Sequence, residues 1–311
     1  MKTNLTGLHH ITAISSDVKR NMQFYTQVLG LRFVKKSVNQ DDTGTYHLYY
    51  GNYTGAPGTA LTFFPWAGLP RGRPGKGQSY ATAFSVPAGS LAFWQERLAR
   101  LKITSFPVEN RFADQVLPFL DHDGLRLELV ATSETDLRPP TPSPEIPAGH
   151  AIRGFHSSTL ALGTSAPTAA VLTGPMGYRF LSESGHRARY TVAEGGPGTY
   201  VDLLTDPALP RGLSGAGTIH HVAFRTPDEA AQVTARQVLL GDSLQVSPVI
   251  DRAYFKSIYY REPGGVLFEI ATDQPGFAID EPVETLGSKL SLPPHLEPHR
   301  AEIEAGLPKI N

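Results

Sequence analysis

The sequence predicts an α+β protein built from four β-α-β-β-β modules that form two curved-sheet clefts. The same order of one strand, one helix and three strands can be laid over four stretches of the chain, residues 8–64, 80–131, 153–206 and 218–272. Equivalent positions on the first and last strands of these stretches lie 46 to 53 residues apart. Because one module cannot bury a face of its sheet alone, the modules must pair, and each pair curves around a cleft.

The last stretch shows this order most clearly. The segment "HHVAFRTPDEAAQVTARQVL" (220–239) reads as an alternating strand, a Pro-Asp helix start and an apolar helical spacing. Short strands are predicted around 245–250 and 253–261. The turn "EPGG" then leads into a last strand, "VLFEIAT" (266–272).

The other three stretches repeat the pattern with local differences. The first begins with "LHHITAI" and has a helix that Gly30 ends. The second begins with "YATAFSVP", which overlays "HHVAFRTP" so that Ala81 takes the place of His221. The third begins with "RGFHSSTLAL" and has a weaker helix that ends near "MGYRF".

Composition between the modules predicts the domain organisation. Modules 1 and 2 form an N-terminal half, residues 1–136, and the Pro-rich "LRPPTPSPEIP" marks a linker over residues 137–152. Modules 3 and 4 form a C-terminal half, residues 153–280. Residues 281–311 form a tail with a short helix near 297–305.

Charge and hydropathy exclude several classes of function. The net charge is −1, from 28 basic and 29 acidic residues, so the chain has no basic field for nucleic acid. No apolar stretch is long enough to cross a bilayer. The first residues, "MKTNLTGLHH", have no apolar signal core, which predicts a cytoplasmic protein. The oligomeric state stays open, a homo-oligomer included.

The chain contains no cysteine and eleven histidines. Disulfides, thiolate zinc sites, iron–sulfur clusters and a cysteine nucleophile are therefore excluded. Any metal ion must be held by nitrogen and oxygen atoms.

The module overlay identifies candidate ligands for such an ion. The positions that face each other on first and last strands are His10 and Phe63, Ala81 and Glu128, His156 and Asp202, and His221 and Glu269. In a pair of modules these strands converge at the cleft, so residues far apart in sequence meet there.

Two imidazoles and one carboxylate on one side of a metal leave neighbouring coordination sites open, as in non-heme Fe(II) oxygenases. Fe(II) and Mn(II) suit such a set, whereas Zn or Ni would suit a Lewis-acid enzyme. Glu269 stands between Phe268 and Ile270, and an unpaired carboxylate would be costly to bury there.

Two pairings of the modules lead to two different sites. If modules pair in chain order, His156, His221 and Glu269 share a cleft. If the outer modules 1 and 4 pair, His10, His221 and Glu269 meet, and the inner cleft holds Glu128, His156 and Asp202. The twin doublets "GLHHITAI" (7–14) and "TIHHVAFRT" (218–226) favour outer pairing, because module 3 lacks one. A second metal or a hydrogen-bonded remnant could fill the inner cleft.

The modules and their motifs resemble the vicinal oxygen chelate superfamily, which includes glyoxalases, extradiol dioxygenases and antibiotic-resistance proteins. The resemblance covers residues 7–280 and is sharpest to the ring-cleaving dioxygenases that act on hydroquinones. It is carried by six segments, "LHHITAI", "TYHLYYGN", "APGTALTFFPW", "RGFHS", "IHHVAF" and "RAYFKSIYYREPGGVLFEIATD".

The resemblance implies that His10, His221 and Glu269 hold iron. It also implies that His220, Arg252 and Tyr259 surround the iron, with His9 and Thr12 close by as residues that bind the substrate. In this reading His220 acts as acid–base, while Arg252 and Tyr259 stabilise developing negative charge. By strand alternation His9 and His220 should point away from the cleft, so a bulge or twist must redirect them.

The aromatic ring of a substrate would rest against an apolar lining, for which we select Phe63, Phe224 and Phe255. The sequence thus predicts an Fe(II)-dependent dioxygenase that cleaves hydroquinone-type diols with O₂. Two alternatives stay open. One is a glyoxalase-type, metal-dependent isomerase or lyase. The other is a non-catalytic protein that binds an aromatic ligand or quinone on the same fold.

Overall fold

The computed structural model describes residues 2–310, and each predicted module has one strand, one helix and three strands in that order. The elements of modules 1 and 4 are β1 (Gly7–Ser15), α1 (Val18–Gln23), β2 (Arg32–Asn39), β3 (Asp42–Gly51), β4 (Ala60–Pro65), β13 (Ile219–Thr226), α4 (Glu229–Gly241), β14 (Ile250–Asp251), β15 (Phe255–Arg261) and β16 (Leu267–Pro275). Those of modules 2 and 3 are β5 (Gln78–Val86), α2 (Leu91–Arg100), β6 (Glu109–Arg111), β7 (Asp114–Leu120), β8 (Arg126–Ala131), β9 (Gly154–Ala161), α3 (Ala166–Thr173), β10 (Arg179–Ser184), β11 (Arg187–Thr191) and β12 (Tyr200–Leu204).

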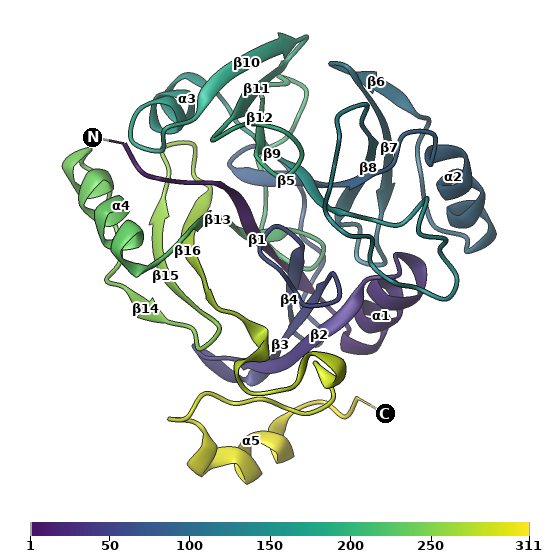
Figure 1. Ribbon diagram of the computed structural model, residues 1–311, viewed down its shortest axis with the longest axis vertical. Helices are drawn as coiled ribbons and strands as arrows, with labels where there is room; N and C mark the ends of the chain where they lie inside the picture. Colours follow the sequence, from purple (N-terminus) through teal and green to yellow (C-terminus); the bar gives the residue numbers. More distant parts are fainter. Residues whose placement is uncertain (1, 311) are drawn as a thin grey trace.

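The outer modules pair with each other, and so do the inner ones. One eight-stranded sheet has the order β14-β15-β16-β13-β1-β4-β3-β2, and the other has the order β10-β11-β12-β9-β5-β8-β7-β6. In each sheet the two modules join through antiparallel first strands, β1 with β13 and β5 with β9. Each sheet therefore combines one module from either side of the 137–152 linker, and the two curved sheets lie side by side (Figure 1).

Aspartate residues cap the start of two of the helices that flank the sheets. The carboxylate of Asp17 accepts hydrogen bonds from two backbone amides of α1, and that of Asp228 accepts one from the backbone amide of Ala231 in α4. A π-helical turn, Phe24–Val28, continues α1 before Gly30 ends it at a φ of 69°. Helix α4 flanks β15 and β16, and α2 flanks β7 and β8 (Figure 1). No helix within residues 2–310 is both long and apolar enough to cross a membrane.

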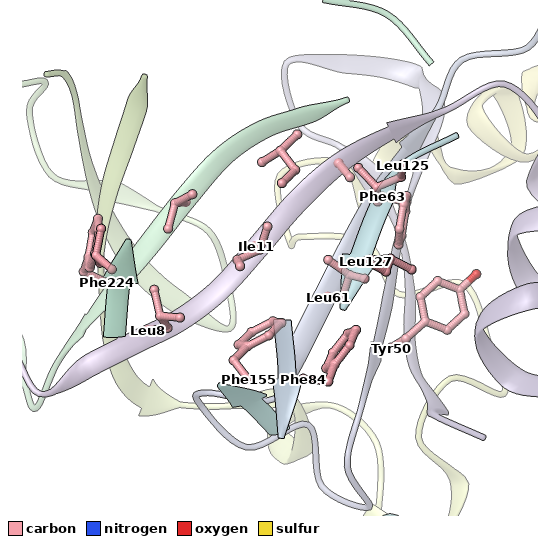
Figure 2. Close-up of a cluster of buried hydrophobic side chains, with 14 of the residues drawn as sticks. Leu8, Ile11, Tyr50, Leu61, Phe63, Phe84, Leu125, Leu127, Phe155 and Phe224 are labelled. Carbon is pink, nitrogen blue, oxygen red and sulfur yellow. The ribbon is translucent and has the colours of Figure 1, made fainter. Parts of the chain in front are cut away.

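The two sheets share one hydrophobic core. Leu8 and Ile11 of β1 belong to the same buried cluster as Phe84 of β5 and Phe155 of β9 (Figure 2). The segments that lead into β5 and β13, residues 69–77 and 209–217, also pair with each other across the sheets. Glycine is required in that pairing, because a Cβ on Gly75 would lie 2.3 Å from the carbonyl oxygen of Pro210.

The C-terminal tail closes the open side of the outer sheet. Taken from Gly276, directly after β16, the tail contains three short 3₁₀ turns, Phe277–Ile279, Val283–Thr285 and Glu297–His299, and the helix α5 (Arg300–Gly306), close to the position predicted for a helix. The tail runs beneath β2 and β3 (Figure 1). Lys35 of β2 is fully buried and forms ion pairs with Asp280, at 2.6 Å, and with Glu281. The tail thus connects the end of module 4 to the edge of module 1.

Candidate metal centre

A β-bulge in each first strand sets the direction of the histidine doublets. In the pairing of β1 with β13, the register shifts at His9 and again at His220. Each bulge places one extra residue in the strand, so both histidines of a doublet reach the same side of the sheet. The Nδ1 atoms within each doublet are 2.9 Å apart for His9 and His10 and 2.8 Å apart for His220 and His221.

Outer pairing brings His10, His221 and Glu269 together. Oε2 of Glu269 lies 3.0 Å from Nε2 of His221 and 3.3 Å from Nε2 of His10, and the two Nε2 atoms are 3.3 Å apart. All three side chains are buried. They are the one cluster of three or more candidate metal ligands within the described chain.

The donor atoms of this cluster fit a divalent ion. Ligand atoms about 2.1 Å from an ion and at right angles to each other stand about 3.0 Å apart, close to the three separations here. Oε2 of Glu269 is buried without a hydrogen-bond donor of good geometry, whereas Oε1 accepts a hydrogen bond from Ser257. Burial alone would raise the pKa of Glu269, but the two histidines hold it well below its usual value. A buried carboxylate that stays ionised needs a cation partner.

The flanking histidines support the tautomer that a metal ligand needs. If Nε2 of His10 binds an ion, its Nδ1–H donates to Nδ1 of His9, whose Nε2–H donates to the carbonyl oxygen of Thr272, 3.1 Å away. His221 donates to His220 in the same way, which leaves Nε2 of His220 for the cavity. Burial, followed by the charge of the neighbouring ligand, lowers the pKa of both His9 and His220 to about 3, so both rings are neutral.

A cavity of about 320 Å³ opens onto the cluster. This volume lies at the small end of ligand sites and suits a single substituted ring. Its walls combine aromatic and polar side chains from both modules. Together with His10 and His221 they are Asn39, Gln40, Asp41, His47, Tyr49, Phe64, Trp66, His220, Arg252, Phe255, Tyr259 and Leu267.

Arg252 and Tyr259 stand together in the cavity wall. Nε of Arg252 donates to the hydroxyl of Tyr259 at 3.1 Å. Burial raises the pKa of the Tyr259 hydroxyl, so it stays protonated. Burial alone would lower the pKa of Arg252, but Tyr259 and Asp41 raise it above its usual value. The pair therefore offers a permanent cation and a neutral hydroxyl beside the metal ligands.

Two of the three predicted aromatic lining residues lie elsewhere. Phe255 lines the cavity, but Phe63 and Phe224 are fully buried in the shared core (Figure 2). Phe63 packs on Tyr25, with ring centroids 4.5 Å apart. The lining prediction is wrong for these two residues, because strand alternation turns Phe63 toward the core and its neighbour Phe64 toward the cavity.

The strand register explains the error at Phe63. Ala223, two residues after His221, pairs with Glu269, whereas Thr12, two residues after His10, pairs with Thr62. Thr62 is therefore the counterpart of Glu269 in module 1. The same register shows that Ser157, rather than His156, is the counterpart of His221 in module 3, since Thr159 pairs with Asp202.

His9 and Thr12 lie beneath the cavity rather than in its wall. His9 is buried between His10, Thr272 and Phe255. The hydroxyl of Thr12 is 2.7 Å from that of Thr62 and has no exposed surface. Both residues reach a substrate only through their neighbours, so the prediction of direct substrate contact is wrong for them.

Sequence reasoning missed a second polar group in the cavity wall. His47 of β3 is held at both ring nitrogens, by the hydroxyl of Tyr49 at 2.7 Å and by that of Thr62 at 2.9 Å. Phe64 and Trp66 stand beside it, with Phe64 and His47 ring centroids 4.4 Å apart. The alternation in "TYHLYYG" places His47 and Tyr49 on one face, which was the available signal.

Arginines fill the inner cleft where an ion would lie. Glu128 pairs with Arg111 at 2.7 Å, and Asp202 pairs with Arg189 at 2.8 Å. Arg187 adds a contact to Asp202 at 3.3 Å. The two carboxylates that correspond to Glu269 are thus already neutralised. Of the two alternatives for the inner cleft, a second metal or a hydrogen-bonded remnant, this arrangement fits the hydrogen-bonded remnant.

The paired modules, the curved sheets and the histidine–histidine–carboxylate cluster define a vicinal oxygen chelate protein. The chain belongs to the Glyoxalase/Bleomycin resistance protein/Dioxygenase superfamily, whose family model matches residues 7–270.

Two relatives that match this chain over nearly their full length have names more specific than that of the superfamily. MhqO of Bacillus subtilis (strain 168), named as a ring-cleaving dioxygenase, is 46% identical over 307 residues, which cover 99% of this chain and 97% of MhqO. The chlorohydroquinone/hydroquinone 1,2-dioxygenase of Sphingobium indicum is 35% identical over 304 residues, covering 96% and 94%. These relatives support an oxygenase enzyme.

Solved structures agree with the fold. The crystal structure of a protein from Bacillus subtilis that is named as a dioxygenase has a TM-score of 0.94 at 44% identity, and the match covers 100% of this chain and 99% of that one. Glyoxalase I from Zea mays, at 14% identity, has a TM-score of 0.62 and covers 86% and 92%, which shows the fold alone.

Proposed function

We propose that this protein is an Fe(II)-dependent dioxygenase that opens the ring of hydroquinone-type diols with O₂. The observation that carries the proposal is the cluster of His10, His221 and Glu269 at the base of a small, partly aromatic cavity. The relatives named as hydroquinone and ring-cleaving dioxygenases support the choice of substrate.

The three side chains that would hold the ion come from three neighbouring strands, β1, β13 and β16, and two of them, His10 and His221, line the cavity. Ferrous iron held by these residues would supply open coordination sites for a phenolate oxygen and for O₂, and would allow electrons to pass between them. Phe64, Trp66 and Phe255 bound the space for the ring and keep water from its faces.

The polar wall residues act on the substrate oxygens. Arg252 stabilises negative charge that develops on the diol, and Tyr259 donates a hydrogen bond beside it. Because Nδ1 of the neutral His220 accepts a hydrogen bond from His221, its ring proton is on Nε2, from which it donates a hydrogen bond to negative charge on a substrate oxygen in the cavity.

Oxygen uptake by anaerobically purified, Fe(II)-loaded protein tests the proposal. We expect uptake with hydroquinone and its simple ring-substituted derivatives, and its loss in His10→Ala and Glu269→Ala. Absence of uptake with every para- and ortho-diol would refute the proposal. Turnover of a thiohemiacetal substrate without oxygen, with a redox-silent metal, would show the isomerase alternative instead.

A further inference from the structure

The turn between β2 and β3 covers one side of the cavity mouth. Its residues Asn39, Gln40 and Asp41 line the cavity. Two contacts with side chains of the cavity wall, Arg252 and Trp66, hold the turn in place. The carboxylate of Asp41 lies 3.1 Å from Nη2 of Arg252, and that of Asp42 accepts a hydrogen bond from Nε1 of Trp66 at 2.8 Å.

The Asp41–Arg252 pair sets the charge of the cavity wall. Among the described residues that line the cavity, Arg252 is the one cationic side chain and Asp41 the one carboxylate. A negatively charged group on a substrate ring therefore meets a cation that already has a counter-ion.

We propose that Asp41 is a specificity-determining residue that restricts the site to uncharged para-diols and rejects carboxylated ones. This inference rests on the proposed function. Arg252 uses Nε–H for Tyr259 and one N–H for Asp41, so N–H groups remain to donate to a phenolic oxygen. A carboxylate on the ring, in contrast, is repelled by Asp41 and must compete with it for Arg252.

Ligand binding without turnover tests this inference. The full chain is loaded with Zn(II), which is redox-silent, and titrated without oxygen with hydroquinone and with 2,5-dihydroxybenzoate. Binding is followed by the fluorescence of Trp66, which lines the cavity, while Trp94 is buried in the core. The Asp41→Asn substitution keeps the shape of the side chain and removes its charge.

We expect Asp41→Asn to bind 2,5-dihydroxybenzoate about five-fold more tightly and hydroquinone within about two-fold of the original chain. The five-fold effect should shrink at high salt, because the Asp41 side chain is 74% exposed. Equal changes for both ligands, or no change for the carboxylated one, would overturn the inference.

Asp251→Asn is the matched control. Asp251 precedes Arg252, and its carboxylate accepts a hydrogen bond from the backbone of Ala253 rather than from the arginine side chain. The Asp251→Asn variant should bind hydroquinone and 2,5-dihydroxybenzoate as tightly as the original chain. If Asp251→Asn changed these affinities as much as Asp41→Asn does, the inference would also be overturned. Because binding is read without O₂, a failure of the oxygen-uptake assay would leave this result intact and refute only the dioxygenase proposal.

Discussion

At the scale of single residues, the site depends on which of two neighbours points into the cavity. A bulge at His9 and another at His220 turn whole doublets toward the centre, whereas regular alternation separates Phe63 from Phe64. A one-residue difference in register therefore decides whether a side chain binds a ligand or fills the core.

Removal of the carboxylate ligand should abolish metal binding. We expect Glu269→Gln to lower the affinity for Fe(II) at least about 100-fold, because an amide oxygen carries no charge to balance the ion. Competition titration with a chelating dye measures this loss. Glu128→Gln, at the equivalent position of module 2, should leave metal affinity unchanged. A Glu128 effect as large as that of Glu269 would contradict the assignment.

Phenylalanine substitutions should separate the core from the cavity. Phe63→Ala should lower the free energy of unfolding by about 3–5 kcal/mol, since its ring is fully buried against Tyr25. Phe64→Ala should raise KM for hydroquinone, because its ring borders the substrate space. Urea unfolding and steady-state kinetics measure the two effects. Equal KM changes in both variants would place Phe63 in the cavity after all.

At the scale of elements, the two sheets use the same strand positions for different purposes. All four first strands carry a bulge before the ligand position, at His9, Tyr80, His156 and His220. In the outer sheet the bulge supports metal ligands, and in the inner sheet it places His156 beside an arginine-rich cleft. Repetition of the module thus preserves backbone geometry while the side chains change.

The inner cleft should make the protein less stable in mild acid. Burial, followed by Arg189, Arg138 and Arg111, holds the pKa of His156 well below the usual 6.5. The folded state thus binds fewer protons than the unfolded state, so this stabilisation is complete above pH 6.5 and is lost as the pH falls below it.

His156→Gln should remove up to about 1.4 kcal/mol per pH unit from the dependence of unfolding free energy on pH between 6 and 5. Chemical denaturation at a series of pH values measures this slope. His299→Gln, with a side chain 63% exposed, should leave it unchanged. If the unfolding free energy of His156→Gln depends on pH as steeply as that of the original chain, the pKa of His156 is not lowered in the folded state.

At the scale of the whole molecule, the tail packs against the outer sheet and supports the cavity wall. Phe277 packs on Tyr49 and Tyr254, with ring centroids 5.1 Å apart in both cases. Tyr49 is itself part of the cavity wall, so the tail supports the site from behind. The buried Lys35 anchors the segment through Asp280 and Glu281.

Loss of that anchor should destabilise the fold more than it affects chemistry. We expect Lys35→Met to lower the free energy of unfolding by about 3 kcal/mol, because it leaves the buried Glu281 carboxylate without its cation. Thermal unfolding by circular dichroism measures the loss. Lys289→Met removes a more exposed lysine of the same tail and should change the Tm little. A larger loss for Lys289 would contradict the role of Lys35.

Much of the architecture could be predicted from the sequence, because module repeats and strand alternation are local patterns. The four modules, the twin doublets and the choice of His10, His221 and Glu269 as candidates all came from such patterns. The residues of the cavity wall were harder to predict from the sequence. Alternation places His47 and Tyr49 on one face of a strand and separates Phe63 from Phe64, but which face meets the cavity depends on the partner module, as does the position of the turn that carries Asp41.

The sequence by itself determined the module order, the exclusion of cysteine chemistry and the candidate ligands, since these follow from residue type and periodicity. Only the tertiary structure decided that outer modules pair, that bulges redirect both doublets and that Thr62 rather than Phe63 is the counterpart of Glu269 in module 1. It also decided that arginines neutralise the inner carboxylates. These features depend on register and contact between segments more than two hundred residues apart, which only the packed sheets bring together.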